Sequence, residues 1–338
     1  MHLNLKFCEI IEFREENNSF RKNQGFFLLV KNKLNNHWEQ PLCLICGSHK
    51  NSPYLTVPDR FNPREKFQLV KCNGCGFVFL SPRPDEESIG AYYQSEAYQP
   101  HQEKASSFSE KIYRWVRNRN VRYKRRIIER IVEKGNLLDY GCGTGEFLLE
   151  MQQSGWQTIG YEPAEKAAKI AREYGIQMIR NLSEIKSKLN VITMWHVLEH
   201  VHQANELLDK IHQVLDPEGM LIIAVPNRLS FEAQMYRSNW VAWDAPRHLY
   251  HFTPADMARL LDKHSFQIVD HKMLYFDPWY NALLSASLET SGKNGPIKIV
   301  ALFKALLFGK LSMFFGVLDK KRASSVIYLA KPVTQNIS

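Results

Sequence analysis

The amino-acid sequence lacks a recognisable secretory signal. Its start, MHLNLKFCEIIEFREENNSF, contains no compact apolar stretch behind a basic segment, and export signals are built that way. Hydrophobic residues make up 44% of the 338-residue chain and charged residues 23%, an ordinary balance that excludes wholesale disorder. We therefore expect a folded protein that stays in the cytoplasm.

A long apolar run free of charges is also absent. The most apolar stretch, residues 297–318, is interrupted by Lys298, Lys304, Gly309 and Lys310, and the lysines fall on different sides of a helix. This pattern argues against a membrane-spanning helix. We expect one or two helices that cap an active site, while an in-plane contact with a membrane or a lipid-linked substrate stays open.

The chain has no acidic excess, because 44 Lys and Arg residues outnumber 35 Asp and Glu residues, which gives a net charge of +9. Such a charge suits nucleic acid, anionic lipid or phosphorylated substrates, but solvated helix faces produce the same total. The densest basic run, residues 114–130, has Trp115, Tyr123, Ile127 and Ile131 available for an apolar stripe. We interpret this run as a helix with a solvated basic face.

Cysteine is scarce, yet four of the six cysteines form two CxxC pairs, Cys43 with Cys46 and Cys72 with Cys75. Each pair aims two thiolates at one point, and a glycine after the second cysteine permits the tight turn. Disulfides are the alternative, but a cytoplasmic chain offers no oxidising environment. The pattern predicts a closed zinc ribbon, in which the metal is structural.

Two common nucleotide-binding patterns are missing from the glycine-rich segment at residues 137–148, LLDYGCGTGEFL. The dinucleotide fingerprint needs glycine at position 146, where Glu146 stands, and a Walker loop needs a Lys-Ser or Lys-Thr pair. The segment nevertheless predicts a buried strand, a turn at Gly141, Gly143 and Gly145, and the start of a helix. Glycines there let a ligand lie against the backbone without meeting a Cβ atom.

A second acidic position supports a ligand site at this turn. The short apolar strand TIGYEP, residues 158–163, ends at Glu162. In a doubly wound sheet the end of the second strand lies beside the first βα turn, and a carboxylate there accepts both hydroxyls of an adenosine ribose. The alternative is that Glu162 only neighbours the N-cap of the next helix.

These motifs resemble those of the class I S-adenosylmethionine-dependent methyltransferases, whose first motif has the form hhD-h-GxGxG and whose second strand ends in an acid. The resemblance covers roughly residues 110–331 and includes VITMWHVLEHV at 191–201 and LIIAVPN at 221–227. Asn190 departs from the Asp with which the fourth strand often begins. The resemblance implies that S-adenosyl-L-methionine contacts Asp139, Gly141, Cys142, Gly143, Gly145, Glu162, Trp195 and His196.

The fold implied by this resemblance is an α/β, Rossmann-like sheet of seven strands, mostly parallel with the last strand antiparallel, preceded by the zinc ribbon. We expect strands near 137–140, 157–161, 177–180, 191–195, 220–225, 267–275 and 325–330.

The expected domain organisation has five parts. They are an N-terminal extension at 1–36, the zinc ribbon at 37–82, a helical linker and lid at 83–134, the methyltransferase domain at 135–331 with a helical insertion at 282–322, and a tail at 332–338.

Histidines are the first candidates for acid–base chemistry, because hydroxyl and carbon acceptors must lose a proton during methyl transfer and histidine titrates near neutrality. His196, His200 and His202 cluster at the end of the fourth predicted strand. The carboxyl ends of strands in open α/β folds bind ligands. We take His196 as the first choice for contact with cofactor or acceptor and His200 as a further catalytic candidate.

A second cluster lies in WDAPRHLYHFTP, residues 243–254, before a helix that Thr253 would cap. His248 and His251 are candidates for a base or a hydrogen-bond donor, and Arg247 for binding a carboxylate or phosphate. The alternative for these residues is that they brace the loop. Trp240 and Trp243 suit stacking on a sugar ring or a base, and they suit a core position equally well.

The paired knuckles, the proline turn after them and the YY...Y segment resemble the zinc-ribbon methyltransferases of bacterial sugar and surface-polysaccharide pathways. Sugar C-methyltransferases of that group usually continue into a further domain for which this chain is too short. We therefore expect O-methylation of a sugar, nucleotide-sugar or lipid-linked glycan intermediate.

The alternatives are an RNA or protein methyltransferase, which the basic charge suggests, and a cofactor-binding module without catalysis. The fourth strand lacks the Asn/Asp-Pro-Pro-aromatic loop of enzymes that methylate base amines, so nucleic acid is not favoured.

Overall fold

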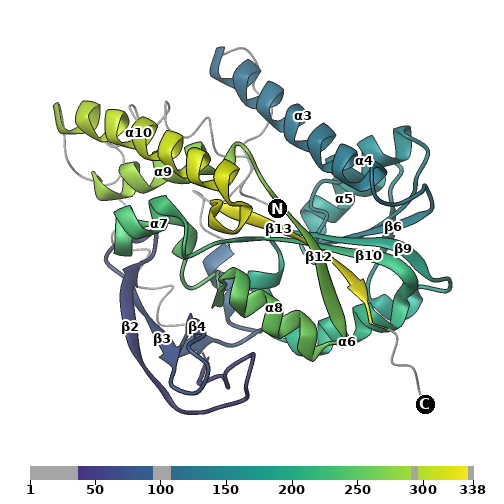
Figure 1. Cartoon of the computed structure of the whole chain (residues 1–338), viewed down its shortest axis with the longest axis horizontal. Helices are drawn as coiled ribbons and strands as arrows, with labels where there is room; N and C mark the ends of the chain where they lie inside the picture. The colour runs from purple at the N-terminus through teal and green to yellow at the C-terminus, as the bar shows by residue number, and fades with distance from the viewer. Residues whose placement is uncertain (1–36, 94–107, 291–295, 334–338) are drawn as a thin grey trace.

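The computed structural model describes residues 37–93, 108–290 and 296–333 (Figure 1). The expected extension at 1–36, part of the linker at 94–107 and the end of the tail lie outside the described residues.

A seven-stranded sheet forms the centre of the molecule, in the order β12-β13-β10-β9-β6-β7-β8. Its neighbours pair in parallel except for β13, which is antiparallel to both β10 and β12. The predicted class I methyltransferase topology is therefore confirmed, and each expected strand is found within a few residues of its place. The strands are β6 (Asn136–Tyr140), β7 (Gln157–Tyr161), β8 (Gln177–Ile179), β9 (Leu189–Trp195), β10 (Leu215–Pro226), β12 (Phe266–Met273) and β13 (Ser325–Pro332).

Helices cover both faces of this sheet, as the alternation of its apolar residues requires. Leu137 and Trp195 pack in a cluster with side chains of α3 (Phe108–Glu129) and α4 (Glu146–Gln153). Leu138 and Met194 face the opposite way, toward α6 (Ala204–Val214) and α8 (Pro254–Lys263). The helix α5 (Glu165–Glu173) contributes a buried alanine to the first cluster.

The helix α8 begins as its sequence predicts. Thr253 Oγ1 accepts from the backbone N–H of Asp256, and the Asp256 carboxylate accepts from the backbone N–H of Thr253, while Pro254 stands at the first helical position. This capping box satisfies two of the donors that a helix start leaves unpaired.

The basic helix α3 buries a different face from the one that its apolar residues suggest. Trp115 is 53% exposed and Ile131, just beyond the helix, 42% exposed, so two members of the expected stripe lie at the surface. The buried face instead carries Asn120, Lys124, Ile127 and Ile128, which recur at helical spacing. The expected stripe is thus wrong at two of its four positions, because the helix turns a lysine toward the sheet.

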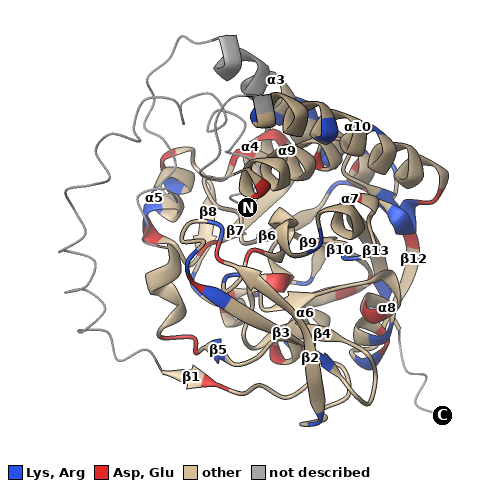
Figure 2. Ribbon diagram, turned by 90° about the vertical axis from the view of Figure 1, so that its left-hand side faces the viewer, with Lys and Arg blue, Asp and Glu red and all other residues tan. Residues whose placement is uncertain are grey.

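The segment with the four cysteines forms a second, antiparallel sheet in the order β11-β4-β3-β2. Its strands are β2 (Asn51–Pro58), β3 (Lys66–Cys72), β4 (Val78–Leu80) and β11 (Tyr250–His251), and β1 (Trp38–Glu39) pairs separately with β5 (Arg83–Pro84). The strand β11 belongs to residues 243–254 of the methyltransferase segment, which we call the histidine-rich loop. The cysteine-containing sheet and this loop are therefore one structural unit, on the opposite side of the molecule from α3 and α10 (Figures 1 and 2).

A buried arginine reinforces that connection. Arg247 Nη2 lies 2.7 Å from Asp59 Oδ1 at the end of β2 and 2.8 Å from Asp244 Oδ1 in its own loop. Burial opposes ionisation of Asp244, but Arg247 and Arg60 outweigh it and hold the pKa of Asp244 well below its usual range. Because removal of Arg247 would leave two buried carboxylates unpaired, we expect its loss to cost about 3–5 kcal/mol.

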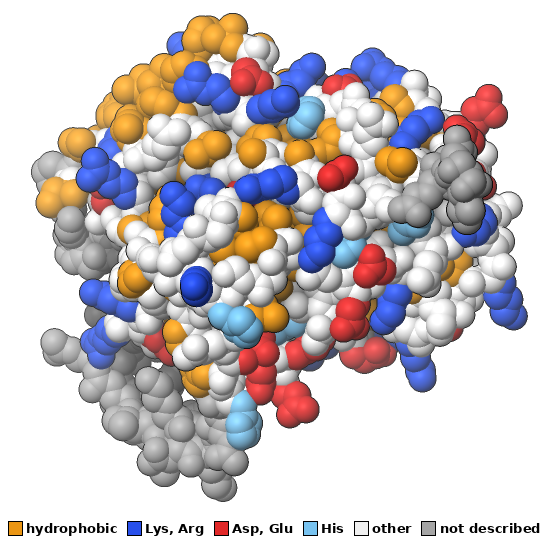
Figure 3. All heavy atoms as spheres, turned by 60° about the horizontal axis from the view of Figure 1, so that its bottom comes forward, with side chains coloured by type: hydrophobic (Ala, Val, Ile, Leu, Met, Phe, Trp, Pro, Cys, Tyr) orange, Lys and Arg blue, Asp and Glu red, His pale blue; other side chains and the backbone are white. Residues whose placement is uncertain are grey.

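Two helices near the C-terminus, α9 (Asp277–Glu289) and α10 (Pro296–Leu318), pack on each other and on α7 (Phe231–Tyr236). Small residues of α10 face inward, among them Ala301, Ala305 and Ser312. Its large apolar residues face outward, and Figure 3 shows hydrophobic side chains gathered at the edge where α10 lies in Figure 1. They are Ile297, Ile299, Val300, Leu302, Phe303, Leu306, Leu307, Phe314, Val317 and Leu318.

In the part of the chain that the structure describes, the stretch Ile297–Leu318 is long and apolar enough to cross a membrane by length and composition, with a mean hydropathy of 1.7. Only 28% of its most apolar 18-residue window is buried. The lysines within this stretch argued against a membrane-spanning helix, but they gave no indication of how much apolar surface the helix leaves exposed.

Candidate functional site

The glycine turn after β6 has a backbone that other residues rarely adopt. Gly141, Gly143 and Gly145 have φ values of 81°, 53° and 81°, in the left-handed region that glycine enters without strain. At Gly141 a Cβ atom would also meet Val197 Cγ2 at 2.5 Å. The turn then leads into α4, whose first N–H groups point to this edge of the sheet.

Glu162 lies beside this turn, as the sequence predicts. It follows β7, and its Oε2 accepts from the Gly143 N–H at 2.8 Å while its Oε1 accepts from the Ala164 N–H at 2.9 Å. A carboxylate with both oxygens at this edge has the chemistry needed to bind ribose hydroxyls. The fit between the glycine turn and the acid supports S-adenosylmethionine as the ligand.

Asp139 in β6 and Lys124 on α3 are both buried and influence each other electrostatically. Thr193 Oγ1 donates to Asp139 Oδ1 at 2.6 Å. Burial raises the pKa of Asp139 to about 6, against the opposing effects of Thr193 and Lys124. Burial likewise lowers the pKa of Lys124 to about 8, although Asp139, Asp277 and Glu146 oppose the change.

Sequence reasoning missed Lys124, because it stands in a run of basic residues of which most are solvated. Its Nζ lies 4.4 Å from the centroid of the Trp195 ring, so the ammonium is held over an aromatic face. One feature of the sequence could have revealed that Lys124 is buried. It stands four residues from both Asn120 and Ile128, which lie on the buried face of α3. Its place next to Asp139 makes it a candidate contact for a carboxylate of the bound cofactor.

Two expected cofactor contacts have their side chains in the core. Cys142 is fully buried beside Met178, and its thiol pKa is raised by burial. Trp195 packs edge-on against Phe147, with ring centroids 5.6 Å apart. Any contribution of Cys142 to ligand binding therefore comes from its backbone.

His196 ends β9 in an unusual conformation, with a φ of 56° that places its backbone in the left-handed region. Its Nε2 lies 3.1 Å from Asp277 Oδ2 at the start of α9, and its Nδ1 lies 3.4 Å from Glu199 Oε1. Burial would lower the pKa of His196, but these two carboxylates raise it above the ordinary value. Such backbone strain persists where surrounding contacts hold it, and it is common at active sites.

Of the other predicted catalytic histidines, His248 and His251 are buried and His200 is half-buried. His200 belongs to the 3-10 turn Leu198–His200, and burial lowers its pKa to about 3. His248 and His251 come from the loop of the cysteine-containing sheet, and burial lowers the pKa of each, that of His251 most strongly. All three are therefore neutral imidazoles at physiological pH. The structure brings His200 and His248 together, with ring centroids 4.6 Å apart.

The remaining loop residues brace the fold. Arg247 is 1% exposed and paired with two aspartates, so it has no free face for a substrate anion. Trp240 and Trp243 are buried against each other with ring centroids 5.1 Å apart. His202 contacts the Pro84 carbonyl oxygen at 3.0 Å.

The four cysteines converge as the ribbon interpretation requires. Cys43 Sγ lies 3.4 Å from Cys75 Sγ, Cys46 Sγ lies 3.5 Å from Cys72 Sγ, and all four sulfurs lie within 4.8 Å of one another. Tetrahedral zinc with four thiolates separates its sulfurs by about 3.8 Å. The donor set and its spacing fit zinc.

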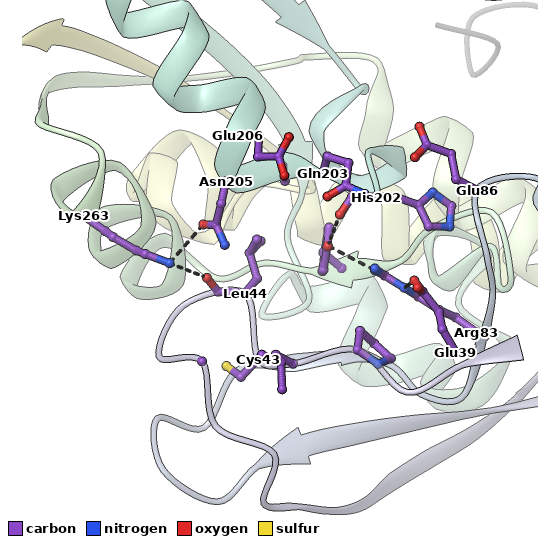
Figure 4. Close-up of a pocket in the computed structure, with 15 residues that line it drawn as sticks. Glu39, Cys43, Leu44, Arg83, Glu86, His202, Gln203, Asn205, Glu206 and Lys263 are labelled. Atoms are coloured by element: carbon purple, nitrogen blue, oxygen red, sulfur yellow. Dashed lines mark hydrogen bonds and ion pairs between the residues drawn. The ribbon is translucent and has the colours of Figure 1, made fainter.

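An open pocket of about 370 Å³ lies between the cysteine-containing segment and α6 (Figure 4). Lys263 reaches across it to donate to Leu44 O and Asn205 Oδ1, both at 3.1 Å. Neither the glycine turn nor Glu162 lines it, so it is a separate cavity from the expected cofactor site.

We expect Glu162→Gln to weaken S-adenosylmethionine binding by about 10- to 100-fold, because a hydrogen bond to a charged group contributes about 1.5–3 kcal/mol. Isothermal titration calorimetry measures the affinity. Glu165→Gln, which alters an exposed acid on α5, serves as the control and should bind as the unaltered protein does. An unchanged affinity in Glu162→Gln would remove the basis for the cofactor assignment.

Comparison with known proteins agrees with this geometry. Residues 113–271 match the family described as Methyltransferase domain. The chain is similar to a ubiquinone biosynthesis O-methyltransferase of Idiomarina loihiensis, with 24% identity over 44% of this chain and 68% of the relative. It is also similar to the C-methyltransferase NovU of Streptomyces niveus, with 20% identity over 44% of this chain and only 38% of the relative.

Among solved structures, the chain is similar to magnesium protoporphyrin IX methyltransferase from Synechocystis PCC 6803 with bound SAH. The TM-score is 0.46, with 14% sequence identity over 73% of this chain and 100% of that chain. The family match, the strand order of the large sheet and the glycine turn beside Glu162 agree with one another. The chain therefore carries a class I S-adenosylmethionine-dependent methyltransferase domain.

Proposed function

We propose that the protein transfers the methyl group of S-adenosylmethionine to a hydroxyl oxygen of a sugar, nucleotide-sugar or lipid-linked glycan intermediate. The observation that carries the proposal is the position of His196, at the end of β9 and in contact with Asp277. An acceptor hydroxyl that enters between them meets an imidazole and a carboxylate, each able to accept a proton. The paired cysteine knuckles, which resemble those of zinc-ribbon methyltransferases of sugar pathways, support a glycan acceptor.

The reaction is a displacement at carbon. The acceptor O–H bond breaks as the proton passes to the His196 and Asp277 pair. The oxygen forms a bond with the methyl carbon while the carbon–sulfur bond breaks, and S-adenosylhomocysteine leaves with the electron pair on sulfur. Since the sulfonium loses its charge, alignment and exclusion of water supply much of the rate, and the buried surroundings of His196 suit that requirement.

The exposed helix α10 favours the lipid-linked member of this acceptor class. Val300, Phe303 and Leu318 are 66%, 68% and 68% exposed, and burying such side chains in a bilayer interface is favourable. Lys298 and Lys310 lie exposed along the same helix, and three basic residues follow at Lys320–Arg322, which suits anionic headgroups. Since α10 packs on α9 and α9 supplies Asp277, the helix pair connects a membrane contact with the site.

We place this contact in the plane of the membrane, on its cytoplasmic side. The inner face of α10 packs on the domain, and the chain after it returns to the central sheet as β13. A helix held along its length by its own domain lies on a bilayer more readily than it crosses one. The cytoplasm also keeps the cysteine thiols reduced.

We further propose that the four cysteines bind structural zinc. Their sulfurs are spaced for a tetrahedral shell, and the apolar residues of this short segment join the core of the methyltransferase domain. Small domains of this kind often depend on a metal for folding. The metal would thereby stabilise β3 and β4, against which the histidine-rich loop pairs.

The acceptor class can be tested with labelled S-adenosylmethionine and cell extract separated into nucleotide-sugar, lipid, RNA and protein fractions. We expect the label in the lipid or nucleotide-sugar fraction as a methyl ether. His196→Asn should retain cofactor affinity and lower kcat by about 100-fold or more, as loss of a general base does. His264→Asn, which alters a buried histidine outside the site, is the control.

Label in RNA or protein, or a carbon–methyl product, would contradict the acceptor assignment. Full activity of His196→Asn would contradict the role of that residue.

The membrane contact can be tested by sedimentation with anionic phospholipid vesicles. We expect the double variant Val300→Asp and Phe303→Asp to bind at least tenfold more weakly, because each change removes an apolar side chain worth about 1.5–3 kcal/mol when buried. Tyr174→Asp, at an exposed aromatic residue after α5 (47% exposed), should bind as the unaltered protein does. Equal binding by the double variant would contradict the proposed contact.

A further inference from the structure

Three side chains of types that bind metal ions, Glu199, His200 and His248, lie close together next to His196. A carboxylate oxygen of Glu199 and a ring nitrogen from each of His200 and His248 all lie within 4.8 Å of one another. Glu199 and His200 come from the 3-10 turn after β9, whereas His248 comes from the loop that joins the cysteine-containing sheet. Glu199 is 0% exposed and His248 is 1% exposed, while His200 is half-buried, so the site is largely buried and is built from two parts of the chain.

Glu199 is poorly satisfied by the protein. Neither of its carboxylate oxygens has a hydrogen-bond donor among the residues that the structure describes. The nearest cationic partner, His196 Nδ1, lies 3.4 Å from Oε1, which leaves Oε2 without a partner there. A buried carboxylate is costly unless charge or hydrogen bonds compensate it. The site is therefore electrostatically suited to a cation.

The two histidines are oriented with their lone pairs available. His248 Nδ1 lies 2.8 Å from the Ala242 carbonyl oxygen, and His200 Nδ1 lies 3.0 Å from both the Arg247 carbonyl oxygen and the Tyr93 hydroxyl oxygen. Because a carbonyl oxygen only accepts, each Nδ1 carries the proton and each Nε2 carries a lone pair. The Nε2 of His248 is buried and has no hydrogen-bond partner in the described part of the chain.

This pattern is typical of metal ligands. A ligating histidine commonly donates its second ring N–H to a backbone carbonyl, which fixes the tautomer and the orientation of the ring. Two imidazoles and one carboxylate suit a borderline divalent ion, and such sets leave coordination positions open for water or substrate.

We propose that Glu199, His200 and His248 bind a divalent transition-metal ion of the zinc type, distinct from the metal of the four cysteines. The ion links the turn after β9 to the histidine-rich loop and supplies the charge that the Glu199 carboxylate lacks. Glu199 contacts both the ion and His196. The ion therefore fixes the acceptor side of the site. The proposal concerns binding and holds for any of the acceptor classes named above.

Cobalt(II) titration of the full-length protein distinguishes this site from the cysteine site. The protein is used as isolated, with its cysteine-bound metal left in place, and bound cobalt is measured by equilibrium dialysis and visible absorption. We expect one equivalent of cobalt that shows d–d bands without a thiolate-to-cobalt charge-transfer band. Absence of such an equivalent from the unaltered protein would overturn the proposal, whatever the variants do.

Variants then assign the ligands. We expect Glu199→Gln and His248→Ala to weaken cobalt binding at least tenfold. The matched controls are Glu232→Gln, at an equally buried carboxylate elsewhere, and His264→Asn, at a buried histidine with both ring nitrogens partnered. Both should bind cobalt as the unaltered protein does. Thermal melting checks that each variant is folded, and equal affinity in folded Glu199→Gln and His248→Ala would also overturn the proposal.

Discussion

The pairing of β11 with β4 is the constraint on which the site depends. Tyr250 and His251 are held opposite Phe79 and Val78 in an antiparallel register, and Arg247 is fixed between two buried aspartates. The same loop donates from Leu249 N–H to the Glu199 carbonyl oxygen at 2.7 Å. The cysteine-containing sheet therefore positions the loop, and the loop positions the turn after β9.

This arrangement explains why charged and polar groups can be buried so densely near His196. Asp277 comes from the start of α9, His248 from the histidine-rich loop, and both His196 and Glu199 from the turn after β9. Each contributes a group that is costly to bury alone and acceptable when its neighbours compensate the charge. The left-handed backbone of His196 adds strain that such a network can maintain. The proposed role of His196 requires such a site, in which water is kept away from the methyl transfer and the acceptor is held in line.

Much of the fold was predictable because its signals are local. Apolar runs marked the strands, and Thr253 with Pro254 marked the start of α8. The glycine turn and Glu162 were predictable as a pair, since parallel strands bring their carboxyl ends to one edge. The CxxC pairs were equally clear, because the turn geometry alone aims two sulfurs at one point.

The parts that sequence reasoning missed depend on long-range packing. The strand β11 has only two residues and pairs with a strand some 170 positions away, so no periodicity reveals it. Arg247 looked available for a substrate anion, yet Asp59, distant in sequence, neutralises it. Lys124 was hidden among solvated basic residues, and Asp277 carries no motif that would connect it with His196. The inward small residues and outward large residues of α10 became clear only once its packing partner was known.

Hydrogen exchange can show whether the cysteine-containing sheet holds the histidine-rich loop in place. The measurement compares Cys46→Ser, which removes the most exposed of the four clustered thiols, with the unaltered protein. We expect the amides of residues 66–80 and 246–252 to lose protection together, while those of β9 and β10 keep theirs. Persistent protection of residues 246–252 after the cysteine-containing sheet has opened would contradict it.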